Sequence, residues 1–214
     1  MSSKIGLLSD PHAAPQPVAE ALAVFRRERV DRVLCAGDIA GYGSALAETI
    51  ALLREGGCTC ILGNHDLWYL ARHRGEEPRI DAFLEVLPGS LEFTIEGCSV
   101  YLVHAHPPDA NRGGIKLRDK QGELDADALA EWAAQLAGFG RQLLIVGHTH
   151  QVYAEWFGPT LLINPGSSAF NHSCAIVTLP EFRVEWFALG EKPISLVWNW
   201  GEYELGEGQA RGRQ

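Results

Sequence analysis

The sequence predicts an α/β sandwich built on β-α-β units. Over the first two-thirds of the 214 residues, short apolar runs alternate with segments of helical pattern, which is typical of such units. The last third contains short β-rich runs separated by Gly, Pro and Asn. With 46% hydrophobic and 21% charged residues, the chain can bury a substantial core. We expect one domain over residues 1–203 and a disordered, polar, Gly-rich tail over 204–214.

The elements of the first two-thirds follow from the apolar runs and the residues beside them. The apolar runs predict strands at 5–9, 32–36, 58–62, 100–104 and 143–146. Helical patterns predict helices near 17–27, 44–55, 64–73 and 125–136. Pro17 suits the start of the first helix, and the Gly56-Gly57 pair suits the end of the second.

The last third predicts antiparallel structure. Residues 91–96 and 99–103 are interrupted by Gly97 and indicate a hairpin. Four further β-rich runs lie at 152–157, 160–163, 174–179 and 183–189. We expect these four runs to be antiparallel strands that complete a second sheet.

Composition excludes several functional classes. The longest apolar runs are too short to span a membrane, and the N-terminal residues lack the pattern of a signal peptide. A formal charge of −9 argues against nonspecific binding to nucleic acid or to anionic membranes. Bound cations can reverse the local field, so an anionic substrate remains compatible with this charge.

The cysteines indicate a reducing compartment. Five are present, an odd number, and most lie within apolar stretches, where reduced cysteine behaves as a small hydrophobic residue. Cys58-x-Cys60 could be half of a zinc site, but no second Cys or His pair follows at zinc-ribbon spacing. We therefore expect structural thiols and a cytoplasmic location.

Residue types that bind metals come directly after five of the apolar runs. Six of the eight histidines lie at these five places. The segments are Asp10-Pro11-His12, Gly37-Asp38, Gly63-Asn64-His65-Asp66, His104-Ala105-His106 and Gly147-His148-Thr149-His150. Ligands bind at the carboxyl ends of strands in open α/β sheets, so we expect the five segments to converge on one pocket.

The residue types at these five strand ends indicate the metal. Carboxylates, an amide oxygen and imidazoles without thiolates suit Mn²⁺ first, with Fe or Zn²⁺ as alternatives. More than four such groups exceed one tetrahedral zinc site, which points to two divalent cations. A carboxylate that bridges them would hold them about 3.5–4 Å apart, and a water between them would supply hydroxide near neutral pH.

These motifs, taken in order, resemble the calcineurin-like metallophosphoesterase superfamily. The resemblance extends from about residue 4 to 179. Gly41-Tyr42-Gly43 and Asn164-Pro165-Gly166-Ser167 are similar to the compact bacterial and archaeal phosphodiesterase-like branch. The resemblance implies a four-layer α/β/β/α sandwich with two mixed β-sheets. It also implies that Asp10, His12 and His150 bind the first metal and that Asp38 bridges the two metals. Asn64, His104 and His148 would complete the second metal site.

The resemblance also implies a proton donor. His65 would protonate the leaving oxygen, and Asp66 would orient its ring. A carboxylate partner raises the basicity of an imidazole and fixes its tautomer. Together the groups would hydrolyse a phosphate ester, and a phosphorylated small molecule or a nucleotide is the expected substrate.

Several departures from the family pattern leave details open. Pro11 separates the first Asp and His, and Ala13-Ala14 follow where relatives usually have glycine and asparagine. His106 could contact substrate or be a solvated loop histidine. No arginine follows soon after Asp38, which disfavours a phosphoprotein phosphatase and favours a diester or a small phosphate ester.

Other residues have a structural interpretation at least as good as a functional one. Tyr42 could line the pocket, although packing beside glycine is the commoner role. The basic loop at 111–123 could face substrate, although a solvated surface is the commoner case. Trp198 and Trp200 could pack on the domain or form a dimer contact, so a homo-oligomer is left open.

Competing functions within this reading are a phosphomonoesterase and a nucleotide pyrophosphohydrolase, because both would use the same metal core. From another class, a metal-binding scaffold of the same fold would have lost catalysis, but the presence of His65 and Asp66 argues against it. A nuclease with a DNA-binding surface conflicts with the negative charge.

Overall fold

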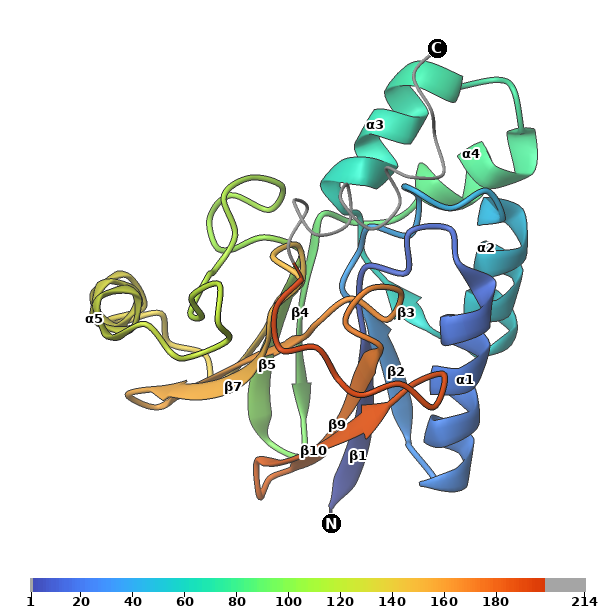
Figure 1. Cartoon of the computed structure of the whole chain (residues 1–214). Helices are drawn as coiled ribbons and strands as arrows, with labels where there is room; N and C mark the ends of the chain where they lie inside the picture. Colours follow the sequence, from blue (N-terminus) through green and yellow to red (C-terminus); the bar gives the residue numbers. More distant parts are fainter. Residues whose placement is uncertain (1, 199–214) are drawn as a thin grey trace.

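The computed structural model describes residues 2–198, in which two five-stranded sheets pack face to face with helices on their outer sides (Figure 1). The layers are therefore α/β/β/α, and the predicted four-layer sandwich with two mixed sheets is confirmed. The tail expected at 204–214 and Trp200 lie outside the described residues.

The first sheet combines the two ends of the described chain. Strands β1 (Ser3–Leu8), β2 (Arg32–Cys35) and β3 (Thr59–Cys60) run parallel to one another. Strand β9 (Ser173–Leu179) lies antiparallel to β1 and to β10 (Arg183–Ala188). The order across the sheet is β10-β9-β1-β2-β3, so the C-terminal strands sit beside the first strand.

The second sheet is formed by the middle of the chain. Strands β4 (Ser90–Ile95) and β5 (Cys98–Val103) form the predicted hairpin, and β6 (Leu143–Ile145) runs parallel to β5. Strand β8 (Thr160–Pro165) runs parallel to β6, and β7 (Val152–Phe157) lies antiparallel to β8 at the edge. The order is β4-β5-β6-β8-β7.

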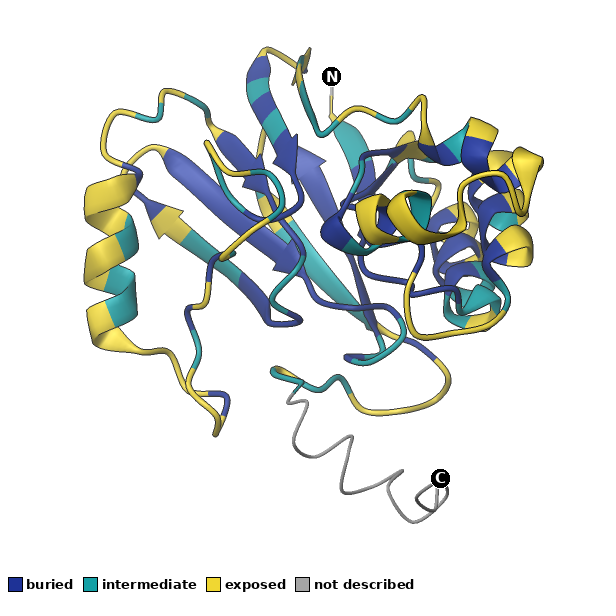
Figure 2. Cartoon of the chain, turned by 90° about the horizontal axis from the view of Figure 1, so that it is seen from above, coloured by how far each residue is buried: buried dark blue, intermediate teal, exposed yellow. Residues whose placement is uncertain are grey.

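The helices cover the two outer faces unequally. Helices α1 (Pro15–Arg27), α2 (Leu46–Glu55), α3 (Asn64–His73) and α4 (Pro78–Leu84) lie on the side of the first sheet. Helix α5 (Ala126–Gln135) lies on the side of the second sheet (Figure 2). Proline begins α1 and two arginines end it, which matches the polarity of the helix dipole.

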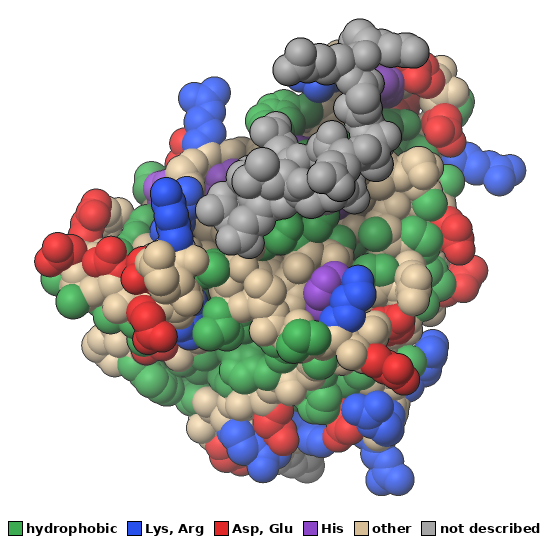
Figure 3. Space-filling model, viewed as in Figure 1, with side chains coloured by type: hydrophobic (Ala, Val, Ile, Leu, Met, Phe, Trp, Pro, Cys, Tyr) green, Lys and Arg blue, Asp and Glu red, His purple; other side chains and the backbone are tan. Residues whose placement is uncertain are grey.

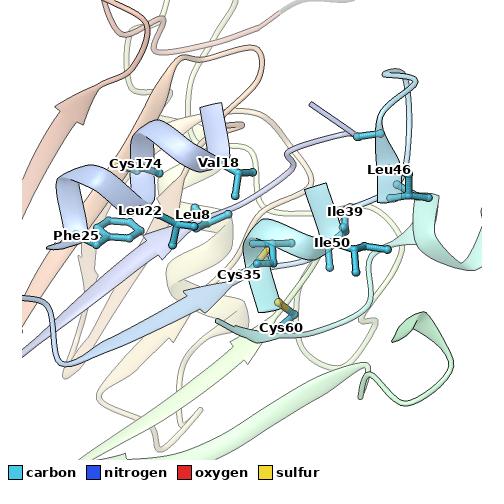
Figure 4. Packing of buried hydrophobic residues seen from close by; sticks show 14 of the residues in the cluster. Leu8, Val18, Leu22, Phe25, Cys35, Ile39, Leu46, Ile50, Cys60 and Cys174 are labelled. Carbon is cyan, nitrogen blue, oxygen red and sulfur yellow. The ribbon is translucent and has the colours of Figure 1, made fainter. Parts of the chain in front are cut away.

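The core has three layers of apolar side chains, set by the alternation along the strands. On β9, Cys174 and Ile176 face the helices, whereas Ala175 and Val177 face the second sheet. Figure 4 shows the helix-facing layer, in which Phe25 of α1 lies close to Leu8 and Cys174. A third layer packs between the second sheet and the segment that includes α5. These layers fix the strand ends that carry the site.

The strand pairing of the last third differs from the prediction. The four β-rich runs do not all complete a second antiparallel sheet: β9 and β10 join the first sheet, and β8 is parallel to β6. Alternating burial predicts that a segment is a strand, but it does not identify the neighbour. Of the five metal-binding segments, three follow strands of the first sheet and two follow strands of the second.

The boundaries differ in smaller ways. Helix α4 was not predicted, because its seven residues are too few to show a helical period. Helix α2 begins at Leu46 instead of residue 44, because Gly43 and Ala45 donate backbone hydrogen bonds to the carbonyls of His12 and Ala13. Within residues 2–198, every helix is too short or too polar to cross a membrane. On the face shown in Figure 3, acidic and basic side chains are intermixed.

Candidate metal centre

The five predicted segments meet at one end of the sandwich. Three follow β1, β2 and β3 of the first sheet, and two follow β5 and β6 of the second. A cavity of about 570 Å³ opens there, and residues of α3 and of the loop after β5 contribute to its lining. Its lining includes side chains from three of the five segments, those after β2, β3 and β6: Asp38, Asn64, His65, His148, Thr149 and His150.

One group of metal-binding side chains comprises Asp10, His12 and His150. The Nε2 atoms of the two histidines lie 3.0 Å apart, and Asp10 Oδ1 lies 3.2 Å from Nε2 of His150 and 3.8 Å from that of His12. All three side chains are buried. These three were the residues predicted for the first metal.

The orientation of His12 leaves its metal-facing nitrogen without a proton. Its Nδ1 lies 3.2 Å from the carbonyl oxygen of Ala40, and a carbonyl can only accept, so Nδ1 carries the hydrogen and Nε2 carries a lone pair. A lone pair, a carboxylate oxygen and a second imidazole nitrogen then converge on one point. Such acceptors repel unless a cation lies between them, so the donor set fits a divalent metal.

The second group comprises Asp38, His104 and His148, with Asn64 among them. His104 Nε2 lies 3.3 Å from Asp38 Oδ2 and 3.1 Å from Asn64 Oδ1. Asn64 Oδ1 is also 2.8 Å from His148 Nδ1. These four residues were predicted for the bridge and the second metal.

The His104 ring is oriented as the His12 ring is. Its Nδ1 lies 2.7 Å from the carbonyl oxygen of Ala36. The carbonyl thus holds the hydrogen on Nδ1 and directs Nε2 at Asp38 and Asn64. Backbone carbonyls that orient metal-binding histidines are a recurrent feature of metal sites.

Asp38 lies between the two groups. Besides its place beside His104, it belongs to a third group with His12 and His65. Its Oδ1 accepts a hydrogen bond from the His65 backbone N–H at 2.8 Å. The position predicted for the bridging carboxylate is thus adjacent to both sets of side chains.

The carboxylates of the site favour their charged form. Burial alone would raise the pKa of Asp10 and of Asp38, but the neighbouring histidines outweigh it and hold both pKa values below the usual range. His150 has the largest such effect on Asp10, and His104 has it on Asp38. Both aspartates are therefore available as anionic ligands.

The imidazoles divide into two kinds. Burial lowers the pKa of His12 and of His148 to about 4 each, so both are neutral near pH 7, as metal ligands must be. Burial also opposes the charging of His104, but Asp38 overcomes it and raises the pKa of His104 to about 10. Without a cation, the protonated His104 ring and the ionised Asp38 carboxylate form an ion pair. A divalent cation would take the place of the proton on the His104 nitrogen that faces Asp38.

The backbone around these side chains is unusual. Five of the seven predicted ligands have φ in the left-handed region, between 46° and 65°: Asp10, His12, Asp38, His148 and His150. Side-chain-bearing residues rarely adopt this conformation, and such strain persists where the surroundings impose it, often at functional sites. Gly63 allows the backbone after β3 to lie close to Asp38, because a Cβ at that position would overlap the Asp38 carboxylate.

The connection between β8 and β9 supports the site from behind. Ser167 Oγ donates a hydrogen bond to the Asp10 carbonyl at 2.6 Å, and Asn171 Nδ2 donates one to the His150 carbonyl at 2.9 Å. Ser167 and Asn171 are fully buried. This connection therefore holds the backbone of two predicted ligands in place.

His65 and Asp66 do not form the predicted pair. Asp66 Oδ1 accepts a hydrogen bond from Ala40 N–H at 2.7 Å, and Oδ2 accepts one from Gly63 N–H at 2.9 Å. Among residues 2–198, no hydrogen bond joins the Asp66 carboxylate to the His65 ring. As the third residue of α3, Asp66 points its side chain back to the helix start and ties together the loops after β2 and β3.

Burial, with the nearby charge of Asp38, raises the pKa of Asp66 to about 7, although its two backbone donors favour the ionised form. Burial lowers the pKa of His65, which is half-buried at the cavity wall. The partner of the His65 ring is Tyr42, whose hydroxyl lies 3.2 Å from Nε2. Sequence reasoning favoured packing for Tyr42, and its position between two glycines gave no sign of this contact.

Aromatic side chains surround the histidines. Phe170 and Trp198 stack with ring centroids 4.2 Å apart, and His150 lies 5.5 Å from Phe170 and 5.2 Å from Trp198. Trp198 lines the cavity, so packing on the domain is the observed alternative for this residue. Phe170 was not predicted, because a single aromatic residue shortly after the Asn164–Ser167 motif gives no sign that it packs against His150.

The basic loop borders the cavity, but His106 does not. Lys116, Arg118 and Lys120 line it, and Lys116 and Lys120 are also exposed, so these lysines are solvated and face the cavity at the same time. His106 instead packs against Trp132 of α5, and its Nδ1 lies 2.9 Å from the Pro107 carbonyl. His106 therefore does not line the cavity and is partly buried in its loop, so neither of its two predicted roles applies.

Gln151, which the sequence did not single out, holds the basic loop in place. Its Oε1 accepts hydrogen bonds from the backbone N–H groups of Leu117 and Arg118, and its Nε2 donates to the Arg118 carbonyl. Gln151 directly follows His150, so the loop wall is tied to the segment that carries two predicted ligands.

Comparisons with known proteins agree with this geometry. The family model of the calcineurin-like phosphoesterase superfamily domain matches residues 3–180. A protein of Methanothermobacter thermautotrophicus, named probable metallophosphoesterase, is 31% identical over 165 residues, which are 76% of each chain.

Two solved structures share the fold. A metallophosphoesterase from Sphaerobacter thermophilus aligns with a TM-score of 0.67 at 20% identity, over 98% of this chain and 94% of the other. A hypothetical protein from Pyrococcus horikoshii aligns with a TM-score of 0.71 at 15% identity, over 97% and 93%.

Proposed function

Because the chain belongs to the calcineurin-like phosphoesterase superfamily and is a hydrolase of phosphate esters, we propose that it cleaves a phosphodiester with two divalent cations. The observation that carries this proposal is the convergence of two metal-binding groups on Asp38, one through His12 and one through His104. A shared carboxylate is the arrangement that places two metals close enough for in-line displacement.

The residues fit a pair of cations. Asp10, His12 and His150 would hold one, Asn64, His104 and His148 would hold the other, and Asp38 would touch both. The mixed oxygen and nitrogen donors suit Mn²⁺, with Fe or Zn²⁺ as alternatives. When bound, the cations would supply Lewis-acid activation of water and neutralise the charge of the phosphate.

His65 is the proposed proton donor to the leaving oxygen. It borders the cavity beside Asp38, and its backbone N–H donates to that carboxylate, so the ring is anchored next to the site of phosphate binding. The Tyr42 hydroxyl at 3.2 Å from its Nε2 positions the ring in the role first assigned to Asp66. Asp66 acts on the loops instead, through its two backbone donors.

A diester is favoured over a monoester by the cavity. Its volume of about 570 Å³ falls in the range of cavities that enclose organic ligands of drug size, so there is room for an ester group on either side of the phosphorus. The five cysteines are all unpaired and four are buried, which supports the cytoplasmic location we propose.

The test uses His65→Ala with Leu67→Ala as its matched control, since Leu67 lies on the same helix, is exposed and does not line the cavity. Hydrolysis of bis-p-nitrophenyl phosphate with Mn²⁺ should fall by roughly 10²–10⁴ in His65→Ala, with metal content near two per chain, and stay unchanged in Leu67→Ala. Unchanged activity in His65→Ala would show that another group donates the proton.

A substrate panel separates the alternative functions. Faster hydrolysis of p-nitrophenyl phosphate than of its diester would indicate a phosphomonoesterase, and preference for dinucleoside polyphosphates would indicate a pyrophosphohydrolase. Full metal content without hydrolysis of any of these would indicate a scaffold. One metal per chain would contradict the dinuclear centre.

A further inference from the structure

A second cavity adjoins the metal site on the far side of His65. It has a volume of about 400 Å³ and is formed mainly by the exposed side of α3. Both cavities are lined by Tyr42, His65 and Trp68, so these three side chains are the partition between them. We call the first cavity the loop pocket, after its Lys116 and Lys120, and the second the helix pocket, after Tyr69, Arg72 and His73.

The helix pocket is lined by one stripe of α3. His65, Trp68, Tyr69 and Arg72 occupy positions i, i+3, i+4 and i+7, which share one helix face. Arg72 lies about 10 Å along the axis from His65, at 1.5 Å per residue. A ligand leaving the metal site past His65 therefore meets an aromatic surface first and a cation next.

Trp68 offers that aromatic surface. Half of the Trp68 surface is exposed (50%), although tryptophan side chains are usually largely buried. Its ring lies 4.6 Å from the His65 ring, centroid to centroid. Exposed aromatic side chains beside a phosphate-binding surface are the groups on which proteins stack nucleobases.

Among the described residues, positively charged side chains without an ion pair lie at both ends of the two cavities. Lys116 and Lys120 in the loop pocket are exposed, and among residues 2–198 neither has an ion pair. Arg72 in the helix pocket is exposed as well and likewise lacks an ion pair within that range. In a chain of formal charge −9, cations left unpaired on both sides of one site favour a ligand that is anionic at both ends.

The loop wall is built to hold its lysine in place. Ile115 and Leu117 are fully buried, and alternation then directs Lys116 outward between them. Arg118 fixes the next turn by donating to the carbonyls of Val152 and Gly122. The position of Lys116 is consequently set by the core and not by a freely moving loop.

We propose that the substrate straddles Trp68 as a short dinucleotide, with its scissile phosphate beside His65, the base of its leaving group on Trp68, and a terminal phosphate at each end, one on Arg72 and one on the Lys116–Lys120 pair. This rests on the proposed function. Water adds to phosphorus, the bond from phosphorus to the leaving oxygen breaks, and His65 gives that oxygen its proton.

The experiment compares diadenylates with both terminal phosphates, with only the 5′ or only the 3′ phosphate, and with neither, in steady-state kinetics with Mn²⁺. In the wild-type protein each terminal phosphate should lower KM by roughly tenfold. Arg72→Ala should abolish the benefit of one terminal phosphate, and the double variant Lys116→Ala/Lys120→Ala should abolish the benefit of the other. The kcat value should change little.

Two controls accompany these variants. Arg79→Ala removes an exposed arginine on α4, and Trp156→Ala removes an exposed tryptophan on β7; neither should alter KM. Trp68→Ala should raise KM for all four diadenylates by about tenfold, which corresponds to about 1.4 kcal/mol of stacking.

The inference is overturned if terminal phosphates do not lower KM, or if both sets of variants act on the same terminal phosphate. Hydrolysis of bis-p-nitrophenyl phosphate in the same preparations keeps the two proposals apart. If that diester is cleaved and the diadenylates show no such pattern, the dinucleotide proposal fails and the phosphodiesterase proposal stands.

Discussion

The floor and the rim of the loop pocket are held in opposite ways. By the floor we mean the five metal-binding segments at the base of the pocket, three of which line it; in these segments Asp10 and His104 are fully buried and Asp38 is 2% exposed. Buried backbone and side-chain partners fix each of these residues. The rim consists of Tyr42, Trp68, Lys116 and Lys120, which are exposed. The difference separates most of the chemistry from the choice of substrate: the floor tolerates little change, and Trp68, Lys116 and Lys120 of the rim can vary without disturbing it, whereas Tyr42 contacts the His65 ring.

The largest expected effect comes from the carboxylate at the centre of the floor. Asp38→Asn removes the negative charge shared by both groups, so metal content should fall below two per chain and hydrolysis should fall roughly a thousandfold. Metal analysis and initial rates measure both. Asp127→Asn, an exposed aspartate in the first turn of α5, is the control and should change neither. Full metal content in Asp38→Asn would break the distinction between floor and rim.

A smaller effect is expected where the floor has no spare volume. Gly63→Ala places a Cβ against the Asp38 carboxylate, and such overpacking costs about 1–3 kcal/mol. The Tm should fall by roughly 3–10 °C and metal should bind more weakly. In Gly89→Ala the nearest heavy atom lies 4.0 Å from the new Cβ, so that variant should melt as the wild type does. Equal melting of the two variants would argue against the close approach.

Asp66→Asn tests the tie between the loops after β2 and β3. An amide N–H₂ would face one of two backbone donors, leaving a buried donor unsatisfied at a cost of about 1–3 kcal/mol. We expect a lower Tm with metal content near two per chain. If Asp66 instead oriented the His65 ring, the variant would lose activity without losing stability, and thermal melting beside a rate measurement distinguishes the two.

The smallest effect is expected at the rim. Arg118→Lys loses one of two hydrogen bonds to the Val152 and Gly122 carbonyls, at about 1 kcal/mol. The KM should rise two- to fivefold as the loop wall loosens, and kcat should hold, because the floor is untouched. Arg112→Lys, exposed in the same loop and outside the cavity lining, serves as the comparison. A large fall in kcat would place Arg118 in the floor.

Sequence reasoning located the floor because each predicted ligand directly follows an apolar run that became a buried strand. Asp10 follows β1 and His148 follows β6, and in each case the burial of the strand fixes where the next residues lie. The rest of the cavity wall was harder to predict, since Tyr42 and Trp198 reach the cavity through contacts between segments distant in sequence. Single-sequence patterns carry no information about such contacts.

The remaining errors share one physical cause. Asp66 was paired with His65 because the two are neighbours in sequence, yet consecutive residues on a helix point in different directions. The strands β8 and β9 were assigned to one antiparallel sheet because an alternating pattern predicts burial of one face but not the identity of the neighbouring strand. Local patterns predicted the elements other than α4 and the polar residues at their ends, and tertiary packing decided their partners.

The connection between β8 and β9 has a consequence for biosynthesis. All seven proposed ligands have left the ribosome's synthetic centre once residue 150 is made, but the buried hydrogen bonds to Asp10 and His150 come from Ser167 and Asn171. Strand β1 also waits for β9, its partner nearly the whole chain away. Pairing across such a separation is slow, so a nascent chain should acquire tight metal affinity only late in translation, after the last third has emerged.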